Sequence, residues 1–124
     1  MKDYKYTLST GEGNRIQQET DKIKGKFGAI LIRNNTAWYR LKIFMRDYPD
    51  VVLFDEDSTD MRSMSRGACY AIVKTNAYNT SNKDYGANDR SQSEFWILND
   101  VLVIQLDGGK NTTTEVVLRC LDGI

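Results

Sequence analysis

The acidic run Asp55-Glu56-Asp57-Ser58-Thr59-Asp60 contains the residue types that come nearest to a chemical site in this sequence. Closely spaced carboxylates can supply the hard oxygen ligands that calcium prefers, and the candidate ligands are Asp55, Asp57 and Asp60. The run departs from an EF-hand loop, because no glycine stands at the sharp turn, no glutamate follows at the right distance and no helices flank it. We therefore favour a solvated turn after a strand, and we predict no bound metal and no cofactor.

Aromatic side chains form a second group that could recognise a ligand. Trp38 and Phe44 fall on the face opposite the predicted core of their strand, and Tyr78, Tyr85 and Trp96 lie in or near a long polar loop. Such rings could stack on a sugar or on a single-stranded nucleic acid, but aromatic residues are also enriched at protein interfaces. The zero net charge argues against nucleic acid, so we favour an interface. The predicted interface residues are Tyr4, Tyr6, Trp38, Phe44, Tyr85 and Trp96.

Missing residue types exclude several kinds of active site. The sequence has no histidine, so a Ser-His-Asp or Cys-His centre cannot be built. Cys69 and Cys120 lie far from a CxxC spacing, which excludes a zinc knuckle and a thioredoxin-type pair. A glycosidase needs two carboxylates across a cleft, but 17 acidic residues make a nearby pair a matter of chance, and no pair is singled out. We therefore predict that the protein is not an enzyme.

The charge balance limits the possible partners. Lys plus Arg and Asp plus Glu each number 17, so broad attraction to nucleic acid or to an anionic membrane is not expected. No apolar run is long enough to span a membrane, and the N-terminus has no signal-peptide core. We expect a protein that is made in the cytosol with its thiols reduced.

The elements that must position these residues are predicted to be strands. Within 124 residues, nine glycines separate short segments rich in Val, Ile, Tyr, Phe and Trp, and no long amphipathic helix is indicated. About seven or eight strands at this spacing predict an all-β fold, a single antiparallel β-sandwich or jelly-roll-like domain. We expect residues 1–21 to be an N-terminal strand and arm, and residues 22–124 to form the sandwich, as one domain overall.

Period-two alternation assigns the core faces. Two strands give clear patterns: one core set is Ile23, Gly25, Phe27, Ala29 and Leu31, opposite Lys22, Lys24 and Lys26, and the other is Tyr39, Leu41, Ile43 and Met45. Residues 51–54 read as a short buried strand. The turn at residues 107–111 predicts a hairpin between residues 101–106 and 114–121.

The order of these segments is similar to that of a known group of proteins. Residues 23–32 (IKGKFGAILI) are followed by a charged strand and by residues 51–54 (VVLF), and residues 95–106 (FWILNDVLVIQL) are followed by Gly108-Gly109 and residues 114–118 (TEVVL). This pattern, over roughly residues 22–121, resembles small β-sandwich virion proteins of tailed bacteriophages that are encoded among the head and connector genes. The sequence departs from that pattern at residues 55–66, which are more acidic, and at residues 79–92, which are longer.

The resemblance implies an assembly function. It points to an auxiliary or decoration protein that stabilises the shell through protein–protein contacts, or alternatively to a head–tail connector, neck or tail component. The implied partners are the major capsid protein or neighbouring virion proteins and further copies of the chain, and the implied location is the virion, after synthesis in the host cytoplasm. Residues 4–20 would be an arm that adds a strand to a neighbour. The aromatic residues leave one alternative, a carbohydrate-binding β-sandwich module.

Overall fold

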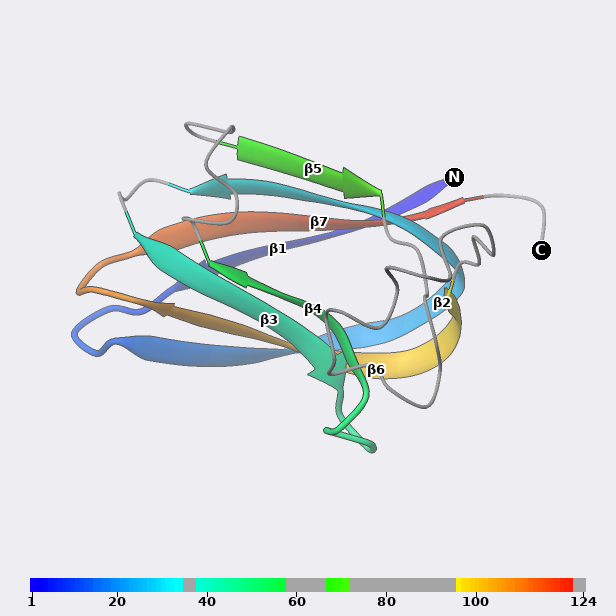
Figure 1. Ribbon diagram of the computed structural model, residues 1–124, viewed down its shortest axis with the longest axis horizontal. Coiled ribbons are helices and arrows are strands. Elements are labelled where there is room, and N and C mark those ends of the chain that lie inside the picture. Colours follow the sequence, from blue (N-terminus) through cyan, green and yellow to red (C-terminus); the bar gives the residue numbers. More distant parts are fainter. Residues whose placement is uncertain (35–37, 58–66, 72–95, 122–124) are drawn as a thin grey trace, which may run out of the picture.

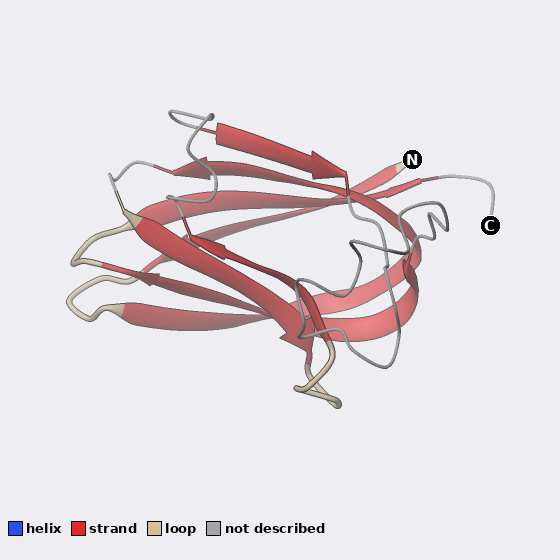
Figure 2. Cartoon of the chain, in the orientation of Figure 1, coloured by secondary structure: helices blue, strands red, loops and turns tan. Residues whose placement is uncertain are grey.

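The computed structural model describes residues 1–34, 38–57, 67–71 and 96–121, and of β5 only the backbone. Every strand pairing is antiparallel, and the described residues contain no helix, so none of these ranges holds a helix that could cross a membrane. The all-β antiparallel prediction is therefore confirmed (Figures 1 and 2). The strands are β1 (Lys2–Ser9), β2 (Arg15–Asn34), β3 (Tyr39–Met45), β4 (Val52–Asp57), β5 (Gly67–Ala71), β6 (Trp96–Gly108) and β7 (Thr113–Leu121).

The seven strands of the described residues belong to one sheet. Its order is β1-β7-β2-β6-β3-β4, and β5 pairs with β2 outside this path. In Figure 1, β2 and β6 curve at the same end of the molecule, so that β5 and the second half of β2 lie above β3 and β4. The two layers are therefore joined through β2, which is 20 residues long, instead of being the two separate sheets of a sandwich. A jelly-roll-like connection stays a prediction.

The predicted C-terminal hairpin is wrong. β6 pairs with β2 and β3, whereas β7 pairs with β1 and β2, so the turn between β6 and β7 connects the two layers instead of two neighbouring strands. The turn between β1 and β2 makes the same kind of crossing. Turn residues of the kind found at 107–111 indicate a reversal of the chain, but they do not specify which strands pair.

A bulge in β2 explains an error in the predicted core. The register against β7 shifts between Phe27 and Ala29, so that Gly28 is an extra residue on β2. Inward-facing positions change from odd to even numbers there, and Ile30 and Ile32 are buried where Ala29 and Leu31 were expected. An alternation rule that assumes a regular strand cannot foresee this change.

A second bulge lies where β2 passes β6. The register shifts between Glu19 and Lys22, and Thr20 is buried there. The Thr20 hydroxyl accepts a hydrogen bond from the Leu102 amide at 3.0 Å and donates one to the Asp21 carbonyl at 2.6 Å. The side chain thus replaces part of the interrupted ladder, as buried main-chain groups require.

The core lies between the layers. On β3 the prediction is confirmed, because Tyr39, Leu41 and Ile43 are buried and Met45 packs against them. β4 differs from the predicted buried strand at residues 51–54, since it begins at Val52 and only Phe54 is buried. The core cluster also includes Leu8, Ile23, Phe27, Leu98, Leu102, Ile104, Leu106, Val116, Leu118 and Cys120. Burial raises the pKa of the Cys120 thiol, which disfavours the reactive thiolate.

The N-terminal segment is not a free arm. β1 pairs with β7 along its whole length, and residues 15–19 pair with residues 103–107 of β6. The predicted boundary between residues 21 and 22 falls inside β2. Tyr4 and Leu8 give the segment its place in the sheet, because both are core residues and exposing them would forfeit apolar burial.

Tyr4 and Tyr6 bind the edge of β2 through their hydroxyl groups. Tyr4, which is 8% exposed, accepts a hydrogen bond from the Lys24 amide at 3.2 Å, and Tyr6 accepts one from the Asp21 amide at 2.9 Å. The Tyr6 hydroxyl also donates to the Asp21 carboxylate at 3.2 Å, and burial raises its pKa. Within the single chain Tyr4 is thus a core residue that links the layers, and its role at an interface stays a prediction.

We expect Tyr4→Phe to lower the free energy of unfolding by about 1–2 kcal/mol, because it leaves the Lys24 amide without its acceptor. Tyr6→Phe is expected to cost less, since its hydrogen bonds are exposed and water can replace them. Urea denaturation of the two variants checks the order. Equal midpoints for Tyr4→Phe and the parent protein would contradict the role given to this hydroxyl.

Candidate functional site

Of the predicted calcium ligands, Asp55 is bound to an arginine and Asp60 lies outside the described residues. Asp55 accepts two hydrogen bonds from Arg40, from Nε to Oδ1 at 2.9 Å and from Nη2 to Oδ2 at 2.9 Å. Asp60 lies outside the described residues. Among the residues that are described, no group of three metal-ligating side chains comes together. Asp55 therefore functions as the partner of an arginine in this structure.

The predicted interface aromatics are scattered. Trp96 packs against the core, and Phe44 is partly buried with the Lys42 ammonium 5.4 Å from its ring centre. Tyr85 lies outside the described residues. Trp38 is 49% exposed and is the one residue of the predicted set that presents a large exposed surface in the described part of the chain. The described members of the set therefore differ in exposure, and only Trp38 among them offers a large surface to a partner.

A row of alternating charges crosses four strands near Trp38. Arg40 of β3 lies opposite Asp107 of β6 and opposite Asp57 of β4, and Asp107 lies opposite Arg15 of β2. Opposite charges at facing positions stabilise a sheet. Arg15 donates from Nε to Asp107 Oδ1, and this carboxylate raises the pKa of the guanidinium further above its ordinary value. Asp55 raises the pKa of Arg40 in the same way.

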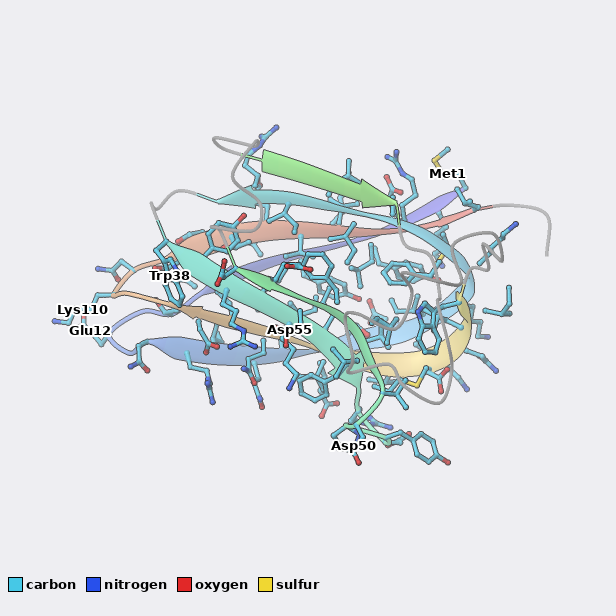
Figure 3. All side chains as sticks on the ribbon, viewed as in Figure 1. Met1, Glu12, Trp38, Asp50, Asp55 and Lys110 are labelled. Atoms are coloured by element: carbon cyan, nitrogen blue, oxygen red, sulfur yellow. The ribbon has the colours of Figure 1, made fainter. Side chains whose placement is uncertain are left out.

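The row borders a pocket of about 460 Å³. The described residues that line it are Asn14, Arg15, Trp38, Arg40, Asp57, Asp107 and Gly108. Figure 3 shows Trp38 at the end of β3 near the turns that carry Glu12 and Lys110, whereas Asp50 lies beyond the other end of that strand. The pocket therefore lies where the strands meet the crossing turns, which are the β1–β2 and β6–β7 turns that pass between the layers.

The crossing turns are joined by their threonines. Thr112 is fully buried, and its hydroxyl donates to the Gly109 carbonyl at 2.9 Å. The Thr10 hydroxyl donates to the same carbonyl at 2.7 Å and accepts a hydrogen bond from the Thr112 amide at 3.0 Å. The Gly108 amide donates to the Asn14 carbonyl at 3.0 Å. These bonds fix the backbone on one side of the pocket.

Sequence reasoning identified only part of this pocket. Trp38 and Asp57 were singled out, but Asn14, Arg15, Arg40 and Asp107 were not. The alternation on residues 38–44 placed Arg40 on the same face as Trp38. Nothing in the sequence placed Arg15 beside Asp107, because the two residues are 92 positions apart and meet only through the register of β2 and β6.

Comparisons with known proteins assign no family. No family model matches the chain, and no curated protein matches it. Among solved structures, the chain is similar to PirA, with a TM-score of 0.46 and 10% identity over 95% of this chain and 94% of that one. It is also weakly similar to the P-domain of Penaeus vannamei nodavirus, with a TM-score of 0.36 and 5% identity over 94% of this chain and 96% of that one.

Proposed function

We propose that the protein is a non-enzymatic structural protein of a virus particle, an auxiliary or decoration protein that stabilises the shell of a tailed phage. The resemblance to phage virion proteins in the sequence pattern of residues 22–121 supports this function. A head–tail connector, neck or tail component is the alternative within the same class. The partners would be the major capsid protein or a neighbouring virion protein, together with further copies of this chain.

The observation that carries the proposal is the outer edge of β1. β1 pairs with β7 from Lys2 opposite Cys120 to Ser9 opposite Thr113, and no strand within the described residues pairs with its other edge. The Asp3 carboxylate accepts hydrogen bonds from Arg119 at 2.8 and 3.0 Å, and this arginine lowers the pKa of the carboxyl. The edge is therefore an ordered template to which a partner can add a strand.

The register between β1 and β7 shows which main-chain amides of β1 point away from β7. The Thr10 amide donates to the Thr112 carbonyl, and this pair continues the β1–β7 register by one step. Because main-chain groups alternate in direction along a strand, even-numbered residues bond to β7, and Lys5 and Thr7 direct their amides outward. The added strand would come from the partner, because residues 2–9 of this chain are already paired with β7.

Quantitative mass spectrometry of purified particles tests the function. We expect the chain in the particles, with a copy number comparable with that of the major capsid protein for a decoration protein, or with that of a single ring for a connector. An abundant host protein measured in the same sample reports contamination. If the chain is no more abundant than that host protein, the virion function is wrong.

Thr7→Pro tests the edge itself. Proline removes an outward amide and is tolerated on an edge strand whose N–H faces solvent, so we expect a folded protein that no longer joins particles. Thr7→Val is the matched control, because it keeps the amide and favours a strand. Both variants would be added to particles lacking the chain and quantified. Equal incorporation of a folded Thr7→Pro variant would exclude strand addition at β1.

A further inference from the structure

We propose that the pocket beside Trp38 binds a neutral sugar. The inference rests on the residues of the pocket and does not depend on the virion function, since its ligand, location and test differ from those of the β1 edge. The pocket volume of about 460 Å³ lies in the range of small-molecule sites, about 300–1,000 Å³. Four features of the pocket support a sugar as the occupant.

The first feature is the exposed indole. Trp38 immediately precedes β3 and is 49% exposed. Tyr39, the next residue, lies opposite Gly108, which has no side chain, and the Gly108 amide bonds to the Asn14 carbonyl. The indole therefore lines the pocket together with Asn14 and Gly108. A flat aromatic side chain that is about half exposed suits the C–H face of a pyranose ring, as aromatic faces suit other flat ligands.

The second feature is the supply of hydrogen-bond donors. Arg15 binds Asp107 through Nε and Nη2, and Arg40 binds Asp55 through the same two nitrogens. In the described part of the chain no hydrogen bond engages Nη1 of either arginine. A guanidinium has five N–H groups in a fixed plane, so each can still donate to a ligand oxygen while its ion pair is kept.

The third feature is the balance of charge. The pocket holds two arginines, Arg15 and Arg40, and two aspartates, Asp57 and Asp107. A hydroxyl group both donates and accepts, so a polyol can bond to the arginines and to the carboxylates together. An anionic ligand would be repelled by the carboxylates or would have to displace them from the arginines. The paired charges thus select a neutral, hydroxyl-rich ligand.

The fourth feature is preorganisation. The ion pairs hold Arg15 and Arg40 in place. The threonine network, in which the hydroxyls of Thr10 and Thr112 bind the Gly109 carbonyl, fixes the turn that contains Gly108. Groups that are ordered before binding lose little entropy when a ligand arrives. Preorganisation therefore strengthens binding at this small site, and many copies acting together would strengthen it further.

The test begins with a glycan array that contains neutral and sialylated glycans, probed with the full chain in a buffer with EDTA. The best neutral glycan is then titrated as its methyl glycoside, with amide chemical shifts as the readout. We expect binding of neutral glycans, and we expect Trp38→Ala and Arg15→Gln each to weaken it by about tenfold or more.

Two exposed residues outside the pocket give matched controls. Tyr48→Ala removes an aromatic ring that is 65% exposed, and Arg33→Gln removes an arginine whose partner is Glu115. Both are expected to bind like the parent protein. The proposal is overturned if no neutral glycan binds, if only sialylated glycans bind, if EDTA abolishes binding, or if Trp38→Ala binds as the parent does. Thermal melts confirm that each variant is folded.

Discussion

Replacement of Gly108 by alanine is expected to lower the free energy of unfolding by about 2–4 kcal/mol, the sum of overpacking and a weakened buried hydrogen bond. A Cβ atom at Gly108 would lie 2.7 Å from Thr112 Oγ1, 2.9 Å from its Cγ2 and 3.0 Å from its Cβ. Thr112 is fully buried and bonded to the Gly109 carbonyl, so it cannot rotate away without losing that bond. The turn would have to move.

Gly109→Ala is the matched control for this substitution. A Cβ atom at Gly109 has no atom within 4 Å, and its φ is not in the left-handed region. We expect a change in stability within about 0.5 kcal/mol, as for other exposed substitutions. Urea denaturation of both variants gives the comparison. Equal stability of the two would contradict the close packing of Gly108 against Thr112.

The threonine network also explains why the two turns are adjacent. Both turns pass between the layers at the same end of the sheet, so their main-chain groups cannot be satisfied by an ordinary hairpin ladder. The two threonine hydroxyls, from Thr10 and Thr112, converge on the Gly109 carbonyl instead. The Asn111 amide donates to the Gly11 carbonyl at 2.8 Å, which ties the turns together a second time. Stability and the shape of the Trp38 pocket therefore depend on the same few residues.

Alternation predicted the parts of the fold where strands are regular. Tyr39, Leu41 and Ile43 are buried as expected, because β3 has no bulge within that span. The prediction was wrong after Gly28, where an extra residue changes which side chains face inward. It was also wrong for the C-terminal hairpin, since strand partners depend on contacts that are distant in sequence. A turn signal is local, whereas pairing of β7 with β1 and β2 is decided by the whole sheet.

The pocket was harder to predict than the core for the same reason. Burial of a residue such as Leu41 follows from its type and its position along one strand. The pairing of Arg15 with Asp107 can be predicted only if the register between β2 and β6 is known. That register changes again at the bulge near Thr20, farther along β2. Exposed charged residues carry no signal that distinguishes a ligand-binding pair from an ordinary surface pair. Trp38 was found because period-two alternation placed its large aromatic side chain on the face opposite the predicted core.

The second large effect is expected at Phe27. Its side chain is completely buried at the point where β2 changes partner from β6, opposite Trp96, to β7, opposite Cys120. Phe27→Ala is expected to lower the free energy of unfolding by about 3–5 kcal/mol, because it removes a large apolar group and leaves a cavity. The loss is a large part of the 5–15 kcal/mol that is typical of a folded domain. Urea denaturation with intrinsic fluorescence measures it, and a reduced unfolding cooperativity is expected as well.

Phe44→Ala separates loss of core packing from loss of an aromatic ring. Phe44 is only partly buried, on the face of β3 that is opposite the core, so we expect a cost of about 1 kcal/mol or less. If Phe27→Ala and Phe44→Ala lower the free energy of unfolding equally, packing of Phe27 does not hold the two layers together. A large loss at Phe27 with a small loss at Phe44 would place the main packing between the layers, with the outer face left free for the ion pairs and the pocket beside Trp38.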